Sequence, residues 1–260
     1  LEATIVRCCE TPPVLEAHHE GVDQTVWAVG GDDSASLIAS FGRRTLYVTD
    51  GHHRLAAAVD ARSRVPERPD DGPLEWIQAV LFADEQMLIL PFHRRVGDRA
   101  GRRADELVEA LGTCGRLTPV ADADAARPQY PGSVGIYLGG GWYTLELPEA
   151  AGDRVVDSLD VSRLQDGILG PVFGVIDPGS DPMIDYVPDP VGICELVERC
   201  DEDNRVGFVL YPTSVTDLMD VADDGDLMPP KSSYFEPKPR SGVFIRRLDR
   251  EQSTRLAPGS

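Results

Sequence analysis

The segment TLYVTDGHHRLAAAVDAR, residues 45–62, sets the expected fold around it. Thr45–Thr49 is a run of β-branched, aliphatic and aromatic residues, which suits a buried strand. Asp50-Gly51 breaks that run, and the residues after it predict a helix from His52 to Arg62. The sequence therefore predicts a strand, a tight turn and a helix in succession.

Further elements are expected on both sides of this motif. The hydrophobic patterns predict strands over residues 4–9, 25–29, 76–82, 87–90, 116–120, 136–138, 142–147, 206–211 and 243–247, and helices over 32–41, 102–111, 161–169, 191–199 and 214–222. We expect the strands over 76–82 and 87–90 to pair, and Thr213 or Ser214 to cap the last helix. Strands and helices that mix without strict alternation favour an α+β fold, with mixed sheets and flanking helices.

The domain organisation follows from a stretch rich in charged and small residues. Residues 1–98 would form one portion, which carries the motif above, and residues 133–260 a second α+β domain, with the boundary inside 98–132. Within the second domain, the proline-rich stretch 227–242 is expected to be an ordered but irregular loop.

Charge excludes several classes of partner. The 260 residues include 44 Asp and Glu against 25 Lys and Arg, a formal net charge of −19. Such a surface repels phosphate backbones and anionic lipids, so nucleic acid and membranes are not expected as partners. The chain has five cysteines without a CxxC pair, no apolar run of membrane-spanning length and no signal sequence, which favours a reducing cytoplasm.

Lysine is scarce in this chain. Only Lys231 and Lys238 are lysines, and both lie in PPKSSYFEPKP, whereas every other basic residue is arginine. An ammonium is a compact point charge and a guanidinium a planar fork, so the two are not interchangeable. The pair suggests that an ammonium is chemically required in this segment.

Asp50-Gly51-His52-His53-Arg54 has the outline of an anion site. A helix N-terminus offers unpaired N–H groups, glycine lets the backbone come close, and arginine can grip phosphate oxygens. Asp50 could hold Mg²⁺ that bridges those phosphates. The plainer alternative makes Asp50 an N-cap and the histidines ordinary helix-start residues. A transition-metal site is a weaker competitor, because adjacent histidines diverge on a helix, although His93 could add a ligand.

Two further segments carry candidate chemistry. His93 follows an apolar strand in PFHRR, where functional side chains often project, and the alternative is a structural histidine. In MPPKSSYFEPK, prolines restrict the backbone, so Lys231 and Ser232 could meet a phosphate with little loss of entropy. The alternative there is a rigid surface crossover with solvated lysines.

Four segments together resemble the bacterial and archaeal domain-of-unknown-function family 1015. They are YVTDGHHRLAAA (47–58), LILPFHRRV (88–96), LDVSRLQDGILGPVFG (159–174) and YPTSVTDLMDVADDGDLMPPKSSYFEPKPRSGVFIR (211–246). Members of that family are typically longer at the N-terminus, with a PPYDV-like motif that this sequence lacks. The chain therefore resembles the C-terminal two-thirds of such a protein.

The DGHHR signature also resembles that of ParB/sulfiredoxin-fold phosphotransferases, including free serine kinases. The resemblance implies a ParB/sulfiredoxin-like motif at 45–62, Asp50 as the metal-linked carboxylate, and Mg²⁺ with ATP or ADP. The resulting candidate residues are Asp50, His53 and His93 for catalysis, and Gly51, His52, Arg54, Lys231 and Ser232 for binding phosphate or nucleotide.

The function that follows is a nucleotide-dependent phosphotransferase acting on a small metabolite, similar to free serine kinase. A phosphoester hydrolase and a non-catalytic protein that binds a nucleotide or phosphometabolite are the alternatives. The expected partners are a small-molecule substrate and a nucleotide, and assembly into a homo-oligomer is compatible with the sequence.

Overall fold

The computed structural model describes residues 1–19, 21–65, 72–239 and 242–246. Contacts between Cα atoms divide the chain into two units, Leu1–Val48 and Thr49–Ser260. The predicted domain boundary inside 98–132 lies within the second unit and stays a prediction. No helix in the described ranges has the length and apolar character needed to cross a bilayer.

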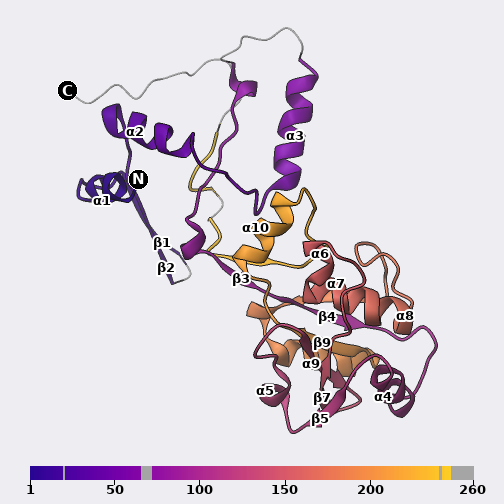
Figure 1. Ribbon diagram of the computed structural model, residues 1–260. Helices are drawn as coiled ribbons and strands as arrows, with labels where there is room; N and C mark the ends of the chain where they lie inside the picture. Colours follow the sequence, from indigo (N-terminus) through magenta and orange to yellow (C-terminus); the bar gives the residue numbers. More distant parts are fainter. Residues whose placement is uncertain (20, 66–71, 240–241, 247–260) are drawn as a thin grey trace. The chain divides into compact units, whose positions relative to one another are not determined.

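The first unit contains two helices and a hairpin (Figure 1). Helix α1 (Glu2–Cys9) precedes the antiparallel strands β1 (Leu15–His19) and β2 (Val22–Val26), and α2 (Gly31–Phe41) follows. Helix α1 shows that the predicted strand over residues 4–9 is wrong. Thr4 and Cys8, four residues apart, form its buried face, a helical spacing that the short apolar run concealed. Arg7 of α1 pairs with Asp33 of α2.

A six-stranded antiparallel sheet organises the second unit (Figure 1). Its strands lie in the order β5-β7-β6-β9-β4-β8. They are β4 (Phe92–Val96), β5 (Leu117–Val120), β6 (Ser133–Leu138), β7 (Gly141–Glu146), β8 (Ile184–Pro188) and β9 (Val206–Leu210). Strand β9, VGFVL, is buried along its whole length because it pairs on both sides and both of its faces are covered.

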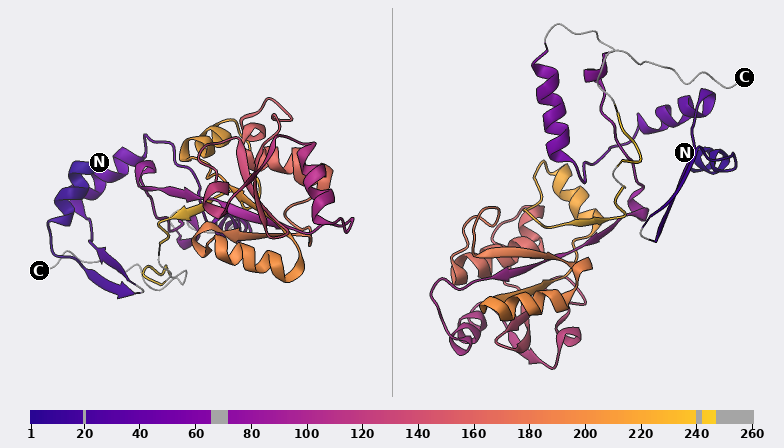
Figure 2. Two further views of the ribbon diagram at one scale, coloured as in Figure 1. Left: turned by 90° about the horizontal axis from the view of Figure 1, so that it is seen from below. Right: turned by 180° about the vertical axis from the view of Figure 1, so that it is seen from behind.

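Helices cover both faces of this sheet (Figure 2). Helix α9 (Ile193–Asp203) packs on one face through Leu196 and Cys200. The larger core on the opposite face takes residues from most of the other helical segments. The remaining helices around the sheet are α4 (Ala104–Gly112), α5 (Ala123–Ala126), α6 (Val155–Ser158), α7 (Asp160–Leu164) and α8 (Gly170–Phe173), with a π-helical turn at Gln165–Leu169 and a 3₁₀ turn at Asp189–Val191.

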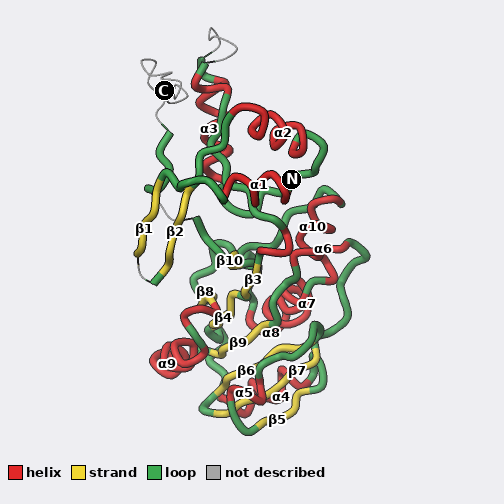
Figure 3. The backbone as a smooth tube through the Cα atoms, turned by 90° about the vertical axis from the view of Figure 1, so that its left-hand side faces the viewer, coloured by secondary structure: helices red, strands yellow, loops and turns green. Residues whose placement is uncertain are grey.

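A second, two-stranded sheet joins segments far apart in the chain (Figure 3). Strand β3 (Leu88–Leu90) pairs antiparallel with β10 (Tyr234–Glu236), which lies in the segment predicted to be irregular. Ile89 and Phe235 of this pair pack on Leu218 of α10 (Val215–Asp223). The predicted pairing of 76–82 with 87–90 is therefore wrong, since β3 pairs with a strand almost 150 residues away instead.

Helix α3 (His52–Ser63) confirms the helical half of the central motif. The strand expected over residues 45–49 does not form, and neither do those over 76–82 and 243–246; residue 247 lies outside the described residues. A strand needs a hydrogen-bonded neighbour, which local composition does not supply. Helix α3 is followed by a 3₁₀ turn, Pro73–Glu75, tied to it by an ion pair of 2.8 Å between Arg62 and Glu75. A further 3₁₀ turn spans Asp84–Gln86.

The expected fold class is confirmed. The second unit combines antiparallel sheets with flanking helices in an α+β arrangement. The helices predicted over 32–41, 102–111, 191–199 and 214–222 are present within a few residues, as is the hairpin of β6 and β7.

Candidate functional site

Gly51 turns the chain into α3 and opens the candidate site. It is the N-cap residue, with φ 89° and ψ 21°, a left-handed conformation that glycine adopts readily and other residues disfavour. Its carbonyl accepts the first helical hydrogen bond, from the Leu55 N–H at 2.9 Å. No side-chain hydrogen bond caps this helix in the described structure, so Asp50 does not act as the N-cap considered above. The N–H groups of the first turn are therefore left to solvent or a ligand.

The side chain of Arg54 folds back over this turn. A Cβ atom added at Gly51 would lie 2.9 Å from Nη2 and 3.0 Å from Nε of Arg54. Nη2 also lies 3.3 Å from Oδ2 of Asp50, and the two side chains are 75% and 72% exposed. So exposed a pair contributes little to stability and can rearrange around a ligand at small cost.

These residues line a surface hollow of about 360 Å³. Its walls are Asp50, Gly51, His52, His53 and Arg54, and both histidines are exposed. The hollow thus combines a helix N-terminus, a guanidinium and two imidazoles, all of which can donate hydrogen bonds to an anion. Backbone and side chains together form a shallow hollow that is open to solvent.

Asp50 is the only carboxylate among the lining residues and is therefore the candidate ligand for a hard metal ion. Within the described ranges, no three His, Cys, Asp or Glu side chains are grouped as a metal site, so His52, His53 and His93 form no joint ligand set there. Mg²⁺ needs fewer protein ligands, since it is commonly bound by one or two carboxylates, with phosphate oxygens and water as its other ligands. A solvent-facing Asp50 fits that role.

His93 lies in the interior of the protein and has no exposed surface. Its Nε2 is 3.1 Å from Oδ1 of Asp189, and its Nδ1 accepts a hydrogen bond of 3.4 Å from the N–H of Leu210. Burial lowers the pKa of His93 to about 4, so the ring is neutral at pH 7 and carries its proton on Nε2. This geometry links β4 to β9 and to the turn after β8, as a structural histidine does.

Lys231 and Ser232 lie in the loop before β10, and only Ser232 is buried. The Ser232 hydroxyl donates a hydrogen bond of 2.6 Å to the carbonyl of Pro229, which fixes the loop. Lys231 has φ 54°, an unfavourable conformation for a residue with a side chain. Its Nζ lies 5.4 Å from the ring centroid of Phe92. Lys231 is thus exposed to solvent, and the hydrogen bond of the buried Ser232 fixes the loop that carries it.

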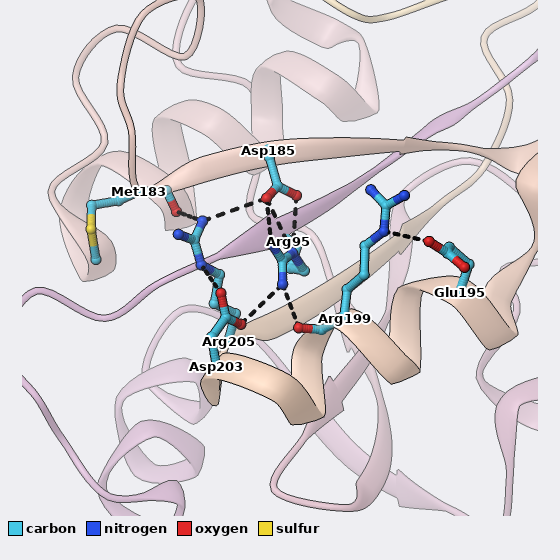
Figure 4. Close-up of polar contacts among 7 residues, drawn as sticks. All are labelled: Arg95, Met183, Asp185, Glu195, Arg199, Asp203 and Arg205. Carbon is cyan, nitrogen blue, oxygen red and sulfur yellow. Dashed lines mark hydrogen bonds and ion pairs between the residues drawn. The ribbon is translucent and has the colours of Figure 1, made fainter.

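Two consecutive arginines of β4 have opposite surroundings. Arg95 pairs with Asp185 at 2.6 Å and with Asp203 at 3.0 Å (Figure 4). Arg94 is 4% exposed and forms no ion pair in the described structure; it donates to the Phe92 carbonyl, and its Cζ lies 5.5 Å from the ring centroid of Tyr186. Burial lowers the pKa of Arg94 to about 10, so it remains charged at pH 7.

The structure brings only some of the predicted site residues together. Asp50 to Arg54 line one hollow, whose lining does not include His93, Lys231 or Ser232. Two residues carried no predicted role: Asp189, whose Oδ1 is 3.1 Å from Nε2 of His93, and Phe92, whose ring centroid is 5.4 Å from Nζ of Lys231. The signal for Phe92 was available, because it alternates with His93 along the strand and therefore faces the opposite side.

Comparison with solved structures returns distant likenesses. A mutant free serine kinase in complex with AMP is 13% identical with a TM-score of 0.39, and a mutant in complex with ADP is 14% identical with a TM-score of 0.36. Each comparison covers 72% of this chain and 66% of the kinase, so the chain spans just under two thirds of the kinase's length. A conserved hypothetical protein from Pyrococcus furiosus is 12% identical with a TM-score of 0.36, over 86% of this chain and 75% of that one.

Comparison with curated proteins gives no match. A family model, described as "Protein of unknown function (DUF1015)", matches residues 1–162. That range includes two of the four segments on which the resemblance was based, 47–58 and 88–96, and the lining of the hollow. The segment 159–174 only begins within the range, and 211–246 lies beyond it. Because the match extends over more than half of the sequence, this chain belongs to the DUF1015 family of proteins of unknown function.

Proposed function

We propose that this protein is a nucleotide-dependent phosphotransferase that acts on a small metabolite, with the hollow at the start of α3 as its phosphate-binding site. The proposal rests mainly on Gly51, which adopts a left-handed conformation at the N-terminus of a 12-residue helix. The guanidinium of Arg54 lies over Gly51. These features support binding of an anion at this place.

The electrostatics of the hollow favour phosphate. Unpaired N–H groups and the helix dipole give the start of α3 a partial positive charge, and Arg54 adds a full one. His52 and His53 supply further donors. In a chain of net charge −19, an anion needs such a local positive field in order to bind.

The cofactor expected with this site is Mg²⁺ bound to ATP or ADP. Asp50 would hold the ion, and the nucleotide phosphates and water would complete its ligands. When bound, Mg²⁺ neutralises charge on the transferred phosphoryl group. Arg54, now 3.3 Å from Asp50, would turn toward the phosphate oxygens. Phosphoryl transfer requires mainly such positioning and neutralisation. His53, which lines the hollow, is the proposed group for proton transfer.

A second candidate function, binding without turnover, is favoured by the position of His93. This residue was a candidate for catalysis, yet it has no exposed surface and both ring nitrogens are engaged. A protein that binds a nucleotide or phosphometabolite at the hollow would need no further base.

Product analysis distinguishes these functions. The protein is incubated with Mg²⁺, serine as a test hydroxyl metabolite, and ATP or ADP, and the reaction is followed by ³¹P NMR. Nucleotide-dependent formation of phosphoserine supports the phosphotransferase. Release of phosphate from phosphoserine without nucleotide supports a hydrolase and contradicts the proposal, and binding without any product supports the second candidate.

Variants locate the activity. His53→Ala combined with Arg54→Ala should abolish turnover, because both side chains line the hollow. Arg64→Ala is the matched control, since it removes another Asp–Arg pair of α3, to Asp60 at 2.8 Å, at the opposite end of the helix. Equal loss in the control and in the double variant would contradict the assignment of the site.

A further inference from the structure

We propose a second anion-binding site that binds a phosphate-bearing small molecule. It is formed by Lys231 and Lys238, which lie against the contacting rings of Phe92 and Tyr234, and the buried Arg94 adds a positive charge beside them. None of these cations lines the hollow at Asp50–Arg54. The proposal is therefore independent of the proposed function.

The two lysines are seated in the same way. Nζ of Lys231 lies 5.4 Å from the ring centroid of Phe92, and Nζ of Lys238 lies 3.5 Å from that of Tyr234. The two rings meet edge to face, with centroids 5.8 Å apart. An aromatic face attracts a cation and restricts its stem without neutralising its charge. The ammonium groups are thus positioned and still able to bind an anion.

Neither lysine has a carboxylate partner among the residues that the structure describes. In the described part of the chain, Lys231, Lys238 and Arg94 form no ion pair with a carboxylate. This is unusual in a chain with 44 acidic residues, in which most arginines of the sheet and its loops are paired. Within the described ranges, arginines form most of the ion pairs with carboxylates, and both lysines remain available to a ligand.

Arg94 adds charge from the interior side. Phe92 and Arg94 are two residues apart in β4 and so lie on the same face of the sheet. Arg94 donates to the Phe92 carbonyl, while Lys231 lies over the Phe92 ring. Phe92 therefore connects an exposed and a buried cation. A buried charge without a counter-ion is costly, and an anion nearby would lower that cost.

The loop around Lys231 is held in a defined shape. Lys231 has a positive φ of 54°, and the only other described residue with a side chain and a positive φ is Asn204, which ends α9. The hydrogen bond from Ser232 to the Pro229 carbonyl, at 2.6 Å, closes the turn that contains Lys231. A binding loop fixed before the ligand arrives loses less entropy on binding.

The chemistry of the cations indicates phosphate rather than carboxylate. A planar carboxylate is best matched by the guanidinium fork, which this protein uses throughout its own ion pairs. Two separate ammonium point charges instead suit an anion that carries several charges on several oxygens, as a phosphate ester or pyrophosphate does. Uncharged aromatic edges beside them would contact the carbon skeleton of a phosphorylated metabolite.

The test starts from the His53→Ala/Arg54→Ala protein, so that the hollow does not contribute. Pyrophosphate without Mg²⁺ is titrated calorimetrically into this protein at constant ionic strength, which keeps screening equal. Adding Lys231→Gly and Lys238→Gln should weaken binding by at least about tenfold. Glycine is chosen because it accepts the positive φ of residue 231. Lys231→Arg should recover only part of the affinity, because a planar guanidinium does not replace an ammonium point charge.

Controls make each outcome decisive. Asn204→Gly, at the other positive φ, should leave binding unchanged. If the Lys231→Gly protein does not fold, Lys238→Gln alone must still weaken binding, because that side chain is exposed. Unchanged affinity without the lysines, or equal affinity for malonate and pyrophosphate, would overturn the proposal. If the wild-type protein binds no nucleotide at the hollow but still binds pyrophosphate through the two lysines, the proposed function is contradicted and the second site stands.

Discussion

Arg94 and Arg95 are consecutive residues of β4 with opposite electrostatic surroundings: Arg95 pairs with two carboxylates, whereas Arg94 is buried and has none within the described ranges. Alternation along a strand sends their side chains to opposite faces of the sheet. On one side the ion pairs of Arg95 fasten β4 to β8 and to the end of α9 (Figure 4). On the other face the guanidinium of Arg94 donates a hydrogen bond to the Phe92 carbonyl and lies against the ring of Tyr186.

This contrast predicts opposite effects of two substitutions. Arg95→Met should lower the free energy of unfolding by about 1–3 kcal/mol, because hydrogen bonds between charged groups are lost and Asp185 loses its principal partner. Arg94→Met should leave stability unchanged or raise it, because a buried charge without a counter-ion is removed. Urea unfolding of both variants measures the difference. A larger loss for Arg94→Met than for Arg95→Met would contradict the assignment of Arg94 as uncompensated.

His93 predicts how stability depends on pH. Burial lowers its pKa from 6.5 to about 4, so between these values the unfolded chain takes up a proton that the folded protein does not. Stability should therefore fall as the pH drops from about 6.5 to 4, by roughly 3 kcal/mol from this residue. His93→Gln removes the titration, and the difference between the two unfolding curves isolates it from the carboxylates. Parallel curves would show that His93 is not held neutral.

Gly51 predicts a cost for any side chain at the start of α3. Gly51→Ala should destabilise the protein by about 1 kcal/mol, because alanine disfavours φ 89° and its Cβ would lie 2.9 Å from Arg54. Thermal unfolding gives the change. Gly112→Ala is the control, since that helical glycine has no heavy atom within 4 Å of an added Cβ. Equal melting temperatures for the two variants would argue against the left-handed turn.

The capping hydrogen bonds of Ser214 at the start of α10 should contribute to the free energy of unfolding. Its hydroxyl accepts a hydrogen bond of 3.0 Å from the Asp217 N–H, and the Asp217 carboxylate accepts one of 3.0 Å from the Ser214 N–H. Ser214→Ala should cost about 1 kcal/mol of stability. Chemical unfolding should show no comparable loss for Thr213→Ala, the neighbouring candidate in the sequence. A greater loss at Thr213 would place the cap one residue earlier.

Sequence patterns predicted elements well where short-range interactions decide them. Helix α3, helix α10 with its Ser214 cap, and the β6–β7 hairpin depend on residues close in the chain, and all are present. Strands depend on distant partners. Residues 76–82 have strand-forming composition but form no strand, whereas β3 pairs with β10 from the other end of the chain. No local pattern can specify that choice.

The same limit applies to the candidate site. The sequence placed Asp50–Arg54 correctly at a turn into a helix, because glycine and the helical pattern are local signals. It could not show that His93 would be buried against Asp189, which follows it by almost 100 residues. The scarcity of lysine was visible in the sequence, but its meaning depends on the rings of Phe92 and Tyr234, which only folding brings to Lys231 and Lys238.

Calorimetric titration with Mg·ADP tests the central claim most directly. The wild-type protein and the Arg64→Ala control should bind the nucleotide, and the His53→Ala/Arg54→Ala protein should bind it at least about tenfold more weakly, because its hollow lacks two anion contacts. Equal affinity of the wild-type and double-variant proteins, or no binding by the wild type, would contradict a nucleotide site at the start of α3.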